Sequence, residues 1–124
     1  GMARNEKGLQ KALTLVSDIK KEFWETVKIP GELNSFNNEL DKAGRVIDFI
    51  ELGDLMIRDA LNRKESCGGH FREEFQTEEG EALRDDGNYT FASAWEFKGI
   101  DQPPVLHKED LKFEVVSPSQ RSYK

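Results

Sequence analysis

The side chains most suited to chemistry in this sequence are a cysteine, a histidine and a glutamate. Cys67 and His70 are spaced as a C-x-x-H pair, and Glu73 follows at the same interval. Cys67 activated by His70 would form a nucleophile, and all three would suit a small metal-dependent enzyme. A structural zinc site takes four Cys or His ligands, however, and His107 is the only other histidine. The cysteine would also lie at the C-terminal end of a predicted helix, where the helix dipole disfavours a thiolate.

Two larger groups of side chains also invite a chemical interpretation. One is an acidic stretch that could supply paired acid–base carboxylates, made of Glu73, Glu74, Glu78 and Glu79. Nothing in the sequence buries these carboxylates or gives them contrasting environments, so a solvated stretch is expected. The other is an aromatic set that could stack nucleic-acid bases, made of Tyr89, Phe91, Trp95 and Phe97. The formal net charge of -6 argues against nucleic acid as a partner, so packing is the expected role of these rings.

Established catalytic signatures are absent from the 124 residues. There is no G-x-G-x-x-G, G-x-x-x-x-G-K-[ST], C-x-x-C or H-E-x-x-H, so neither dinucleotide, P-loop nor zinc-protease chemistry is indicated. No apolar run approaches the ~20 residues of a membrane span, and no secretory signal opens the chain. The single cysteine excludes an internal disulfide and suits a reducing compartment. Gly1 before Met2 resembles the remnant of a cleaved tag, which leads us to expect a piece of a larger protein.

The first predicted helix covers residues 5–28. Asn5 is a suitable N-cap, and Pro30-Gly31 stops the helix and turns the chain. Between these points apolar residues recur at helical spacing, at Leu9, Ala12, Leu13, Val16, Ile19, Phe23 and Val27. Leu15 and Trp24 flank this apolar stripe and widen it, so the helix has more apolar surface than one neighbour can cover.

The second predicted helix covers residues 35–63. Asn34 or Ser35 can provide its N-cap, and Gly68-Gly69 is typical of a left-handed C-terminal cap. Its second half is apolar on most sides, at Val46, Phe49, Leu52, Leu55, Met56, Ile57, Ala60 and Leu61. A helix with this pattern is buried on most sides, and a hairpin of two helices cannot bury that much surface. We therefore expect a further partner from the second half of this chain, from another copy or from a missing segment.

The second half of the chain is first polar and then alternating. We expect a loop over residues 67–88, with a short helical turn near residues 79–83. Residues 89–98 alternate between an aromatic face and a face of small or polar residues, which predicts a β-strand. Residues 111–116 alternate again, and pairing can begin at residues 105–107, so an antiparallel hairpin with a long loop is predicted. Its aromatic face needs to pack on the helices or on another domain, because a lone hairpin is marginal in water.

These elements predict a mainly α fold with a smaller β part. An antiparallel helical hairpin is followed by a polar loop region and an antiparallel β-hairpin. We place the helical part at residues 1–65, and the loop, the β-hairpin and the C-terminal tail at residues 66–124. The two parts are expected to form one structural unit.

Three stretches, in this order and at this spacing, resemble the C-terminal domain of the flavoprotein subunit of succinate dehydrogenase and fumarate reductase. Residues 65–74, ESCGGHFREE, are similar to the family's Glu-Ser-Arg-Gly-Ala-His-x-Arg-Glu-Asp. Residues 85–89, DDGNY, are similar to its Asp-Asp-Glu-Asn-Trp, and Arg121-Ser122-Tyr123 is similar to its Arg-x-Tyr ending. The resemblance covers nearly the whole chain. Cys67 stands where arginine is common and Gly69 where alanine is common, which indicates a divergent branch.

The resemblance implies that the chemistry of the complete enzyme lies outside these residues. That enzyme interconverts succinate and fumarate by hydride transfer with FAD, and passes electrons through an iron–sulfur subunit to quinone. The family's flavin-linking and substrate-binding residues precede this domain, so no catalytic, cofactor-binding or metal site is expected here. The domain would be a structural and docking module, with its helical hairpin as part of a truncated three-helix, spectrin-repeat-like bundle. A missing third helix would explain the wide apolar stripes.

The resemblance also implies partners and a location. The domain would pack on the flavin-binding domain of the parent chain and near the iron–sulfur subunit, peripherally on the inner, cytoplasmic face of the membrane, without insertion into it. Five residues are predicted to make the interdomain contact, namely Ser66, His70, Arg72, Arg121 and Tyr123. His70 and Arg72 would supply hydrogen bonds across it. The sequence leaves one alternative open, a free-standing helical interaction protein without enzymatic activity that forms a homodimer through its apolar stripes.

Overall fold

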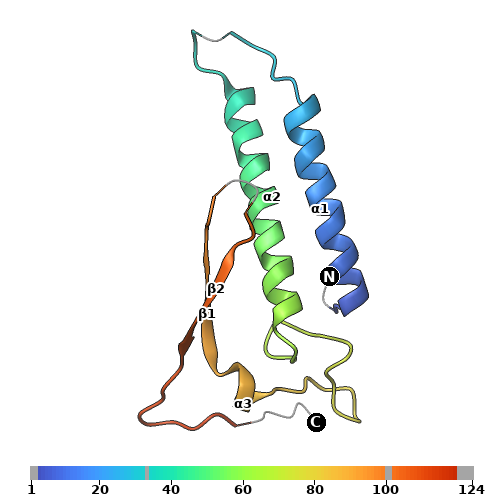
Figure 1. The fold of residues 1–124 in the computed structure, drawn as a ribbon, viewed down its shortest axis with the longest axis vertical. Coiled ribbons are helices and arrows are strands. Elements are labelled where there is room, and N and C mark those ends of the chain that lie inside the picture. The colour runs from blue at the N-terminus through green and yellow to red at the C-terminus, as the bar shows by residue number, and fades with distance from the viewer. Residues whose placement is uncertain (1–2, 33, 100–101, 120–124) are drawn as a thin grey trace. The chain divides into compact units, whose positions relative to one another are not determined.

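The computed structural model describes residues 3–32, 34–99 and 102–119. Within these ranges the elements are, in order, α1 (Glu6–Thr26), α2 (Asn38–Asn62), α3 (Asp86–Tyr89), β1 (Phe91–Glu96) and β2 (Val105–Asp110) (Figure 1). The predicted fold class, mainly α with a small antiparallel β part, is confirmed. The chain divides into two compact units. A helical unit comprises Lys7–Leu61, and a second unit combines the N-terminal peptide up to Glu6 with the chain from Asn62 onward.

The helical unit is an antiparallel hairpin of α1 and α2 (Figure 1). Asn37 caps α2, since its Oδ1 accepts hydrogen bonds from the backbone N–H groups of Glu39 at 3.0 Å and Leu40 at 3.2 Å. The cap predicted at Asn34 or Ser35 is therefore wrong. The helix begins later because the Asn37 side chain is the one that reaches the free N–H groups of the first turn.

The connection between the two helices depends on one glycine. Gly31 has a φ of +117°, which a residue with a side chain rarely adopts. A Cβ atom at this position would also lie 2.5 Å from Nδ2 of Asn37. That nitrogen donates to the carbonyl oxygen of Pro30 at 3.0 Å, so the same asparagine caps α2 and fixes the preceding turn. An ion pair links the two helices, where Lys20 Nζ lies 2.6 Å from the Glu51 carboxylate.

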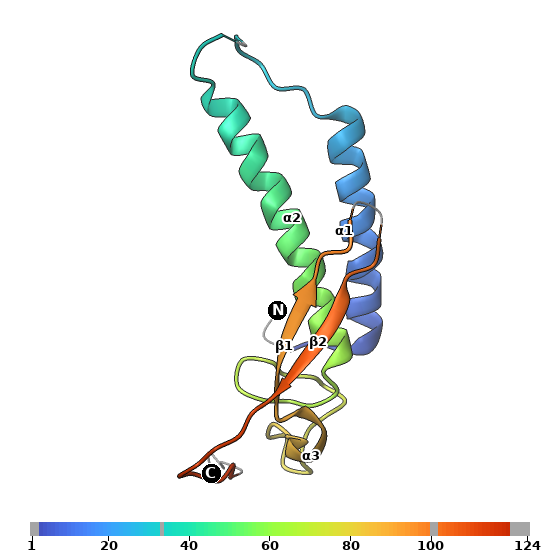
Figure 2. The same cartoon turned by 60° about the vertical axis from the view of Figure 1, so that its left-hand side comes forward.

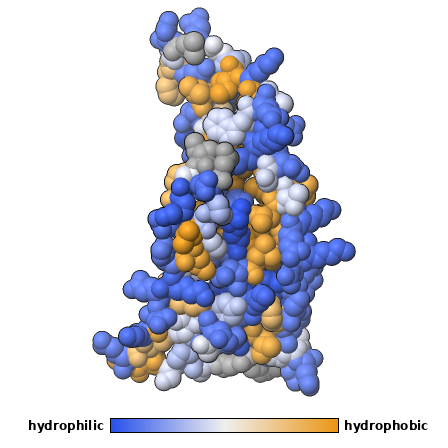
Figure 3. Space-filling view, viewed as in Figure 1, coloured by the Kyte–Doolittle hydropathy of each residue, from blue (hydrophilic) through white to orange (hydrophobic). Residues whose placement is uncertain are grey.

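Much of the apolar surface of the helical unit is exposed. Among the described residues of α1 and α2, only Leu9 and Ala60 are buried. Trp24 and Phe49 are 68% and 70% exposed, and the other exposed large apolar side chains of the two helices are Leu15, Ile19, Leu40, Val46, Leu52 and Met56. Apolar side chains also gather around the connection between the helices (Figure 3). In the part of the chain that the structure describes, no helix combines the length and the hydropathy that a bilayer-spanning segment requires.

The β-hairpin belongs to the second unit (Figure 2). The two strands are antiparallel, with a register that runs from Phe91 opposite Asp110 to Glu96 opposite Val105. Along β1 the more buried residues alternate with exposed ones, as the period-two pattern of the sequence predicted. Phe91 is the buried apolar residue at the start of this strand, so the hairpin is attached to the rest of its unit at that end.

The second strand is not where the sequence pattern placed it. The strand predicted at residues 111–116 is wrong, because β2 occupies Val105–Asp110. The return strand begins directly after Pro104, and its six residues pair with all six residues of β1. Only Leu111 continues the pairing, through its N–H to the Thr90 carbonyl oxygen at 3.0 Å. The alternating segment that follows has no length of β1 left to pair with.

The short helix also lies later than predicted. Residues 79–83 do not form a helical turn; Gly80 N donates instead to the Thr77 carbonyl oxygen at 3.0 Å in a tight turn. A helix forms at Asp86–Tyr89, because Asp85 caps it by accepting from the backbone N–H of Asn88 at 3.2 Å. Tyr89, which the alternation assigned to the strand, is thereby the last residue of α3.

We expect Phe91→Ala to lower the free energy of unfolding by about 3 kcal/mol, because it empties a filled site. The ring is 6% exposed, and the guanidinium carbon of Arg63 and the Nζ of Lys108 lie 5.0 and 4.3 Å from its centre. Phe97→Ala is the matched control, since that side chain is 78% exposed and its loss should change stability by less than about 0.5 kcal/mol. Urea unfolding followed by circular dichroism measures both, and equal midpoints would contradict the expectation.

Candidate functional site

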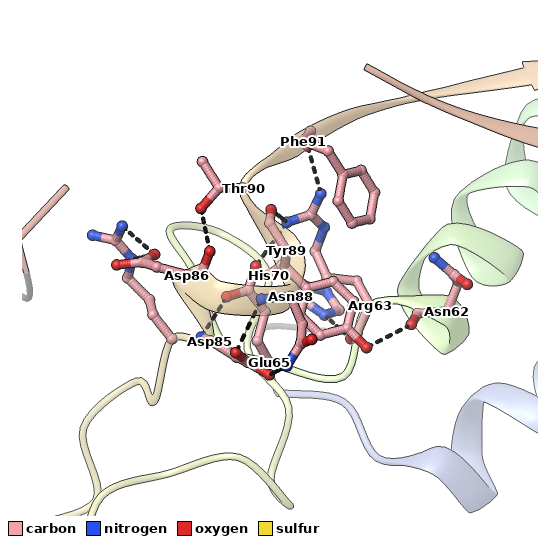
Figure 4. A network of polar contacts seen from close by, with 11 residues as sticks. Asn62, Arg63, Glu65, His70, Asp85, Asp86, Asn88, Tyr89, Thr90 and Phe91 are labelled. Carbon is pink, nitrogen blue, oxygen red and sulfur yellow. Dashed lines mark hydrogen bonds and ion pairs between the residues drawn. The ribbon is translucent and has the colours of Figure 1, made fainter. Parts of the chain in front are cut away.

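The candidate site is a polar network in the second unit, centred on Arg63, the residue that follows α2 (Figure 4). Arg63 Nη1 donates to Oε1 of Glu65 at 2.7 Å and to the carbonyl oxygen of Tyr89 at 3.0 Å. Its Nη2 donates to the carbonyl oxygen of Phe91 at 3.1 Å. The guanidinium thus satisfies two backbone carbonyls at the junction of α3 and β1 and one carboxylate oxygen. Its planar fork of donors suits several acceptors at once, which an ammonium group could not match.

Glu65 is a buried carboxylate in the same network. It is 3% exposed, and its second oxygen, Oε2, accepts from the backbone N–H of Asp85 at 2.8 Å. A buried charge is tolerated when it is paired and hydrogen-bonded, and Arg63 provides the opposite charge. The Asp85 carboxylate in turn accepts hydrogen bonds from the backbone N–H of Asn88 and, at 2.8 Å, from the side-chain amide of Asn88. Glu65 therefore fixes the residue that caps α3.

Ser66 and Arg72, two of the predicted docking residues, are buried inside the loop. Ser66 is 0% and Arg72 1% exposed. The Ser66 hydroxyl accepts from the backbone N–H of Arg72 at 2.8 Å and donates to the Arg72 carbonyl oxygen at 3.1 Å. The Arg72 side chain donates through Nε to Glu74 at 3.0 Å and lies over the Phe75 ring, 5.5 Å from its centre. One serine hydroxyl thereby bonds to both the N–H and the carbonyl group of the Arg72 backbone.

Between these residues the chain forms a tight turn. Cys67 and His70 exchange two backbone hydrogen bonds, of 2.8 and 3.0 Å, and Gly68 adopts a φ of +58° at the tip. The prediction that Gly68-Gly69 caps the second helix is wrong, since α2 ends earlier, at Asn62. The left-handed glycine is used for the turn instead. Cys67, Gly68 and Gly69 are exposed, so the turn projects into solvent.

The ring of His70, the third predicted docking residue, links the residue after α2 to the N-terminal peptide. Its Nε2 lies 2.9 Å from the Arg63 carbonyl oxygen, and its Nδ1 lies 3.2 Å from Nη1 of Arg4. A carbonyl can only accept and a guanidinium can only donate, so Nδ1 accepts and Nε2 carries the proton. Both ring nitrogens are thus occupied. Among the described residues, no group of three or more His, Cys, Asp or Glu side chains is placed to hold a metal ion, and the proposed Cys67–His70–Glu73 set is not brought together.

The N-terminal peptide is bound to the same loop. Arg4 donates its backbone N–H to the carbonyl oxygen of Phe71 at 3.0 Å, and the Arg4 carbonyl oxygen accepts from the N–H of Glu73 at 2.8 Å. Asn5, which precedes α1 as its predicted cap residue, donates its side-chain amide to the Glu73 carboxylate at 2.7 Å. The glutamates of the acidic stretch are all exposed, as the sequence suggested, and Glu73 also binds the peptide that leads into α1.

Glu74 is the other acidic residue at the start of α1. Its carboxylate accepts from the backbone N–H of Glu6 and from Nε of Arg72. Partial burial acts to raise the pKa of the Glu74 carboxyl. The hydrogen bonds from Glu6, Arg72 and the backbone of Glu74 itself, together with the charge of Arg72, outweigh it and hold the pKa below its ordinary value. An anion at a helix N-terminus is also favoured by the helix dipole.

The structure brings together three of the five predicted docking residues, Ser66, His70 and Arg72, while Arg121 and Tyr123 lie outside the described residues. Sequence reasoning missed Arg63 and did not single out Glu65 for a role of its own. The available signal was a pair of opposite charges at the end of a predicted helix, of which Glu65 begins the family-like stretch. Chemically the arrangement neutralises buried charge and satisfies backbone groups, which is the work of a rigid scaffold.

Comparison with known proteins gives a match over nearly the whole chain. The family model described as "Fumarate reductase flavoprotein C-term" matches residues 1–123. The fumarate reductase flavoprotein subunit of Serratia sp. (strain ATCC 39006) is 30% identical over 123 residues, which are 99% of this chain and 20% of that protein. The corresponding subunit of Escherichia coli (strain K12) is 27% identical, over 99% of this chain and 19% of that protein. The chain therefore spans about a fifth of the length of these relatives.

A solved structure shows the same fold. It is described as a quinol-fumarate reductase with menaquinol molecules, and the matching chain superposes with a TM-score of 0.77 at 26% sequence identity. The match covers 96% of this chain and 20% of that chain. An FAD-dependent oxidoreductase of Methanocaldococcus jannaschii is also similar, at 35% identity over 72 residues, or 58% of this chain.

We expect Ser66→Ala to lower the free energy of unfolding by about 1–3 kcal/mol, because it removes the acceptor of a buried N–H. Its hydroxyl makes both bonds to the Arg72 backbone, and neither solvent nor a methyl group can replace them there. Ser117→Ala is the matched control, since Ser117 is exposed and forms no hydrogen bond with another described residue. Urea unfolding should separate the two variants; a Ser66 variant as stable as the Ser117 variant would disprove the role given to this hydroxyl.

The lowered pKa of Glu74 predicts an acid-sensitive attachment of α1. A carboxyl with a lower pKa in the folded state adds stability above its unfolded pKa of about 4.3 and loses it as pH falls through the folded pKa. Glu74→Gln should therefore lower stability at pH 7 and leave a smaller fall between neutral and acid pH. Urea midpoints measured across that range test this, with Glu78→Gln as the control, since Glu78 forms no ion pair with another described residue. Parallel pH profiles for wild type and Glu74→Gln would rule the linkage out.

Proposed function

The chain belongs to the fumarate reductase flavoprotein C-terminal family, and from this premise we propose that it is the structural and docking domain of a flavoprotein that interconverts succinate and fumarate. The observation that carries the proposal is the match of residues 1–123 to the family, in a chain that spans about a fifth of its relatives. In the proposal, the hydride transfer between dicarboxylate and FAD takes place in the remaining four-fifths of the protein. This domain contributes stability and assembly, and no step of the reaction.

The residues that the structure describes do not fit a flavin site. Phosphate groups of dinucleotides are usually held by a glycine-rich turn before a helix N-terminus. Here the first turn of α2 is capped by Asn37 and the N–H of Glu6 in α1 is occupied by Glu74. Two cations of the second unit, the partly buried Arg63 and the buried Arg72, are each paired with a carboxylate. No step through the flavin is therefore assigned to these residues.

The docking contact is proposed to form at the exposed turn of residues 67–69. Ser66, His70 and Arg72 serve it as positioning residues, because their hydrogen bonds hold the two ends of the turn. A turn held in this way presents one conformation to a neighbouring domain, which reduces the entropy lost on contact. Arg121 and Tyr123 are proposed to extend the contact along the C-terminal tail.

The proposed partners are those that the family resemblance implies. The flavin-binding domain of the complete chain is the proposed neighbour of the turn, and an iron–sulfur subunit is the proposed second partner. The complex is proposed to lie peripherally on the inner face of the cytoplasmic membrane. The exposed apolar surface of the helical unit supports a large contact with neighbouring protein, since such surface marks an interaction site.

The proposal is tested by comparing the complete flavoprotein with a variant that lacks residues 3–124, and with the present chain alone. We expect the complete flavoprotein to carry flavin and to reduce fumarate with a reduced viologen dye as electron donor. The truncated variant should lose most of this activity or fail to accumulate, whereas the present chain should be colourless and inactive. A yellow, active preparation of the present chain would overturn the proposal, and so would a gene that encodes no flavin-binding part.

The same preparations test the docking turn. Cys67 is exposed in the chain described here, so it should react readily with a maleimide. In the complete flavoprotein a docked turn is covered, and labelling of the peptide that contains Cys67, followed by mass spectrometry, should be slower. Equal labelling rates in an active flavoprotein would show that the turn does not dock.

A further inference from the structure

The segment that follows β2 has the sequence of a strand but pairs with no strand in the part of the chain that the structure describes. We call residues 111–119 the C-terminal strap. Its first residue, Leu111, makes the hairpin bond to Thr90, and its last, Ser119, accepts a hydrogen bond from Nη1 of Arg84 at 2.9 Å. Between them, residues 112–118 form no hydrogen bond with any other described residue. The strap is thus fixed at both ends and has a free backbone in the middle.

The sequence of the strap favours a β-strand, which the present chain does not form there. Residues 111–116, LKFEVV, alternate apolar and charged and then end in two β-branched residues, a pattern typical of a half-buried strand. The structure instead shows an unpaired segment with a bend at residues 114–115. Natural sequences usually agree locally with their fold, so such a conflict indicates a missing contact.

The apolar side chains of the strap are left in solvent. Leu111 and Phe113 are about half exposed, while Val116 is 65% and Val115 is 94% exposed. Figure 3 shows apolar side chains gathered at the lower left, where Figure 1 places the chain beyond β2. Leu111, Phe113 and Val116 line one side of a hollow of ≈ 270 Å³ whose other side includes Phe91. The strap therefore rests loosely on its own unit and directs part of its apolar surface outward.

We propose that residues 111–116 become a β-strand added to the edge of a sheet in the preceding part of the complete flavoprotein chain. This inference rests on the proposed function. Strand addition uses free backbone groups for affinity and alternate side chains for specificity, and the strap offers both. The chain spans about a fifth of its relatives, so four-fifths of such a protein is available to supply the edge. A second copy of this chain is a poorer partner, because each copy carries a formal net charge of -6.

Hydrogen exchange resolved to single amides distinguishes the paired from the free strap. In the present chain the amides of residues 112–116 should exchange at the rate of an unstructured peptide. In the complete flavoprotein we expect alternate amides in this stretch to exchange at least about tenfold more slowly, because one edge of a strand pairs and the other faces solvent. The intervening amides should stay fast.

A pair of proline variants tests the same geometry. Glu114→Pro and Val115→Pro remove neighbouring N–H groups, which point to opposite edges of a strand. Neither group bonds to a described residue in the present chain, so both variants should fold as the wild type does. In the complete flavoprotein one variant should abolish the slow exchange and the other should keep it, because proline is tolerated where the N–H faces solvent. Equal behaviour of the two variants would overturn the inference.

The outcomes separate this inference from the proposed function. Fast exchange of residues 112–116 in a flavoprotein that contains flavin and reduces fumarate would overturn the strand addition alone. Slow exchange that already appears in the present chain, and increases with its concentration, would assign the strap to a second copy and also overturn it. A complete gene product without flavin or fumarate reduction would overturn the proposed function, and the inference with it.

Discussion

The second unit depends on one buried carboxylate, that of Glu65. Removing a carboxylate from water costs several kcal/mol, and the cost is tolerated only where opposite charge and hydrogen-bond donors surround it. Glu65 receives both, from the Arg63 guanidinium at 2.7 Å and from the backbone N–H of Asp85 at 2.8 Å. Neither donor can move away without leaving the charge uncompensated. The geometry of the loop from α2 to β1 is therefore set by electrostatic necessity more than by regular secondary structure.

This constraint explains how a long polar segment keeps a defined conformation. Loops of this length without regular structure are uncommon in compact domains, because their backbone groups lack partners. Here side chains supply the partners. Arg63 serves the carbonyls of Tyr89 and Phe91, and Ser66 serves both backbone groups of Arg72. Each of these bonds joins positions that are several to many residues apart, so the network ties α3 and β1 to the turn of residues 67–69.

The parts of the fold that periodicity encodes were predictable, and the parts that depend on distant groups were not. The helices follow from their apolar spacing, and β1 follows from its alternation. The start of α2 was missed because three nearby residues could cap it, and only Asn37 has its side chain within reach of the first turn. The strand at residues 111–116 was predicted from an alternation that is real. No strand forms there because Val105–Asp110 already pair with the whole length of β1.

In the candidate site, too, local patterns were predictable and contacts between distant residues were not. Ser66, His70 and Arg72 were found through the family resemblance, which preserves their order along the chain. Arg63 was missed because its acceptors lie 26 and 28 residues further on, and no local pattern connects them. The tautomer of His70 likewise depends on Arg4, which is 66 residues away in the sequence. A side chain whose role is set by distant backbone carbonyls leaves no periodic signal.

The two units differ in how their buried charges are paired and in how much apolar surface they expose. This difference bears on how the proposed complete protein is assembled. In the second unit the buried charges already have partners, so contact with a neighbour does not have to offset their desolvation. In the helical unit large apolar side chains such as Trp24 and Phe49 remain in water. Burial of apolar surface is the dominant favourable term in protein association, at roughly 25 cal/mol per Å². Affinity in the proposed assembly therefore comes chiefly from the helices, while the preformed polar loop contributes orientation.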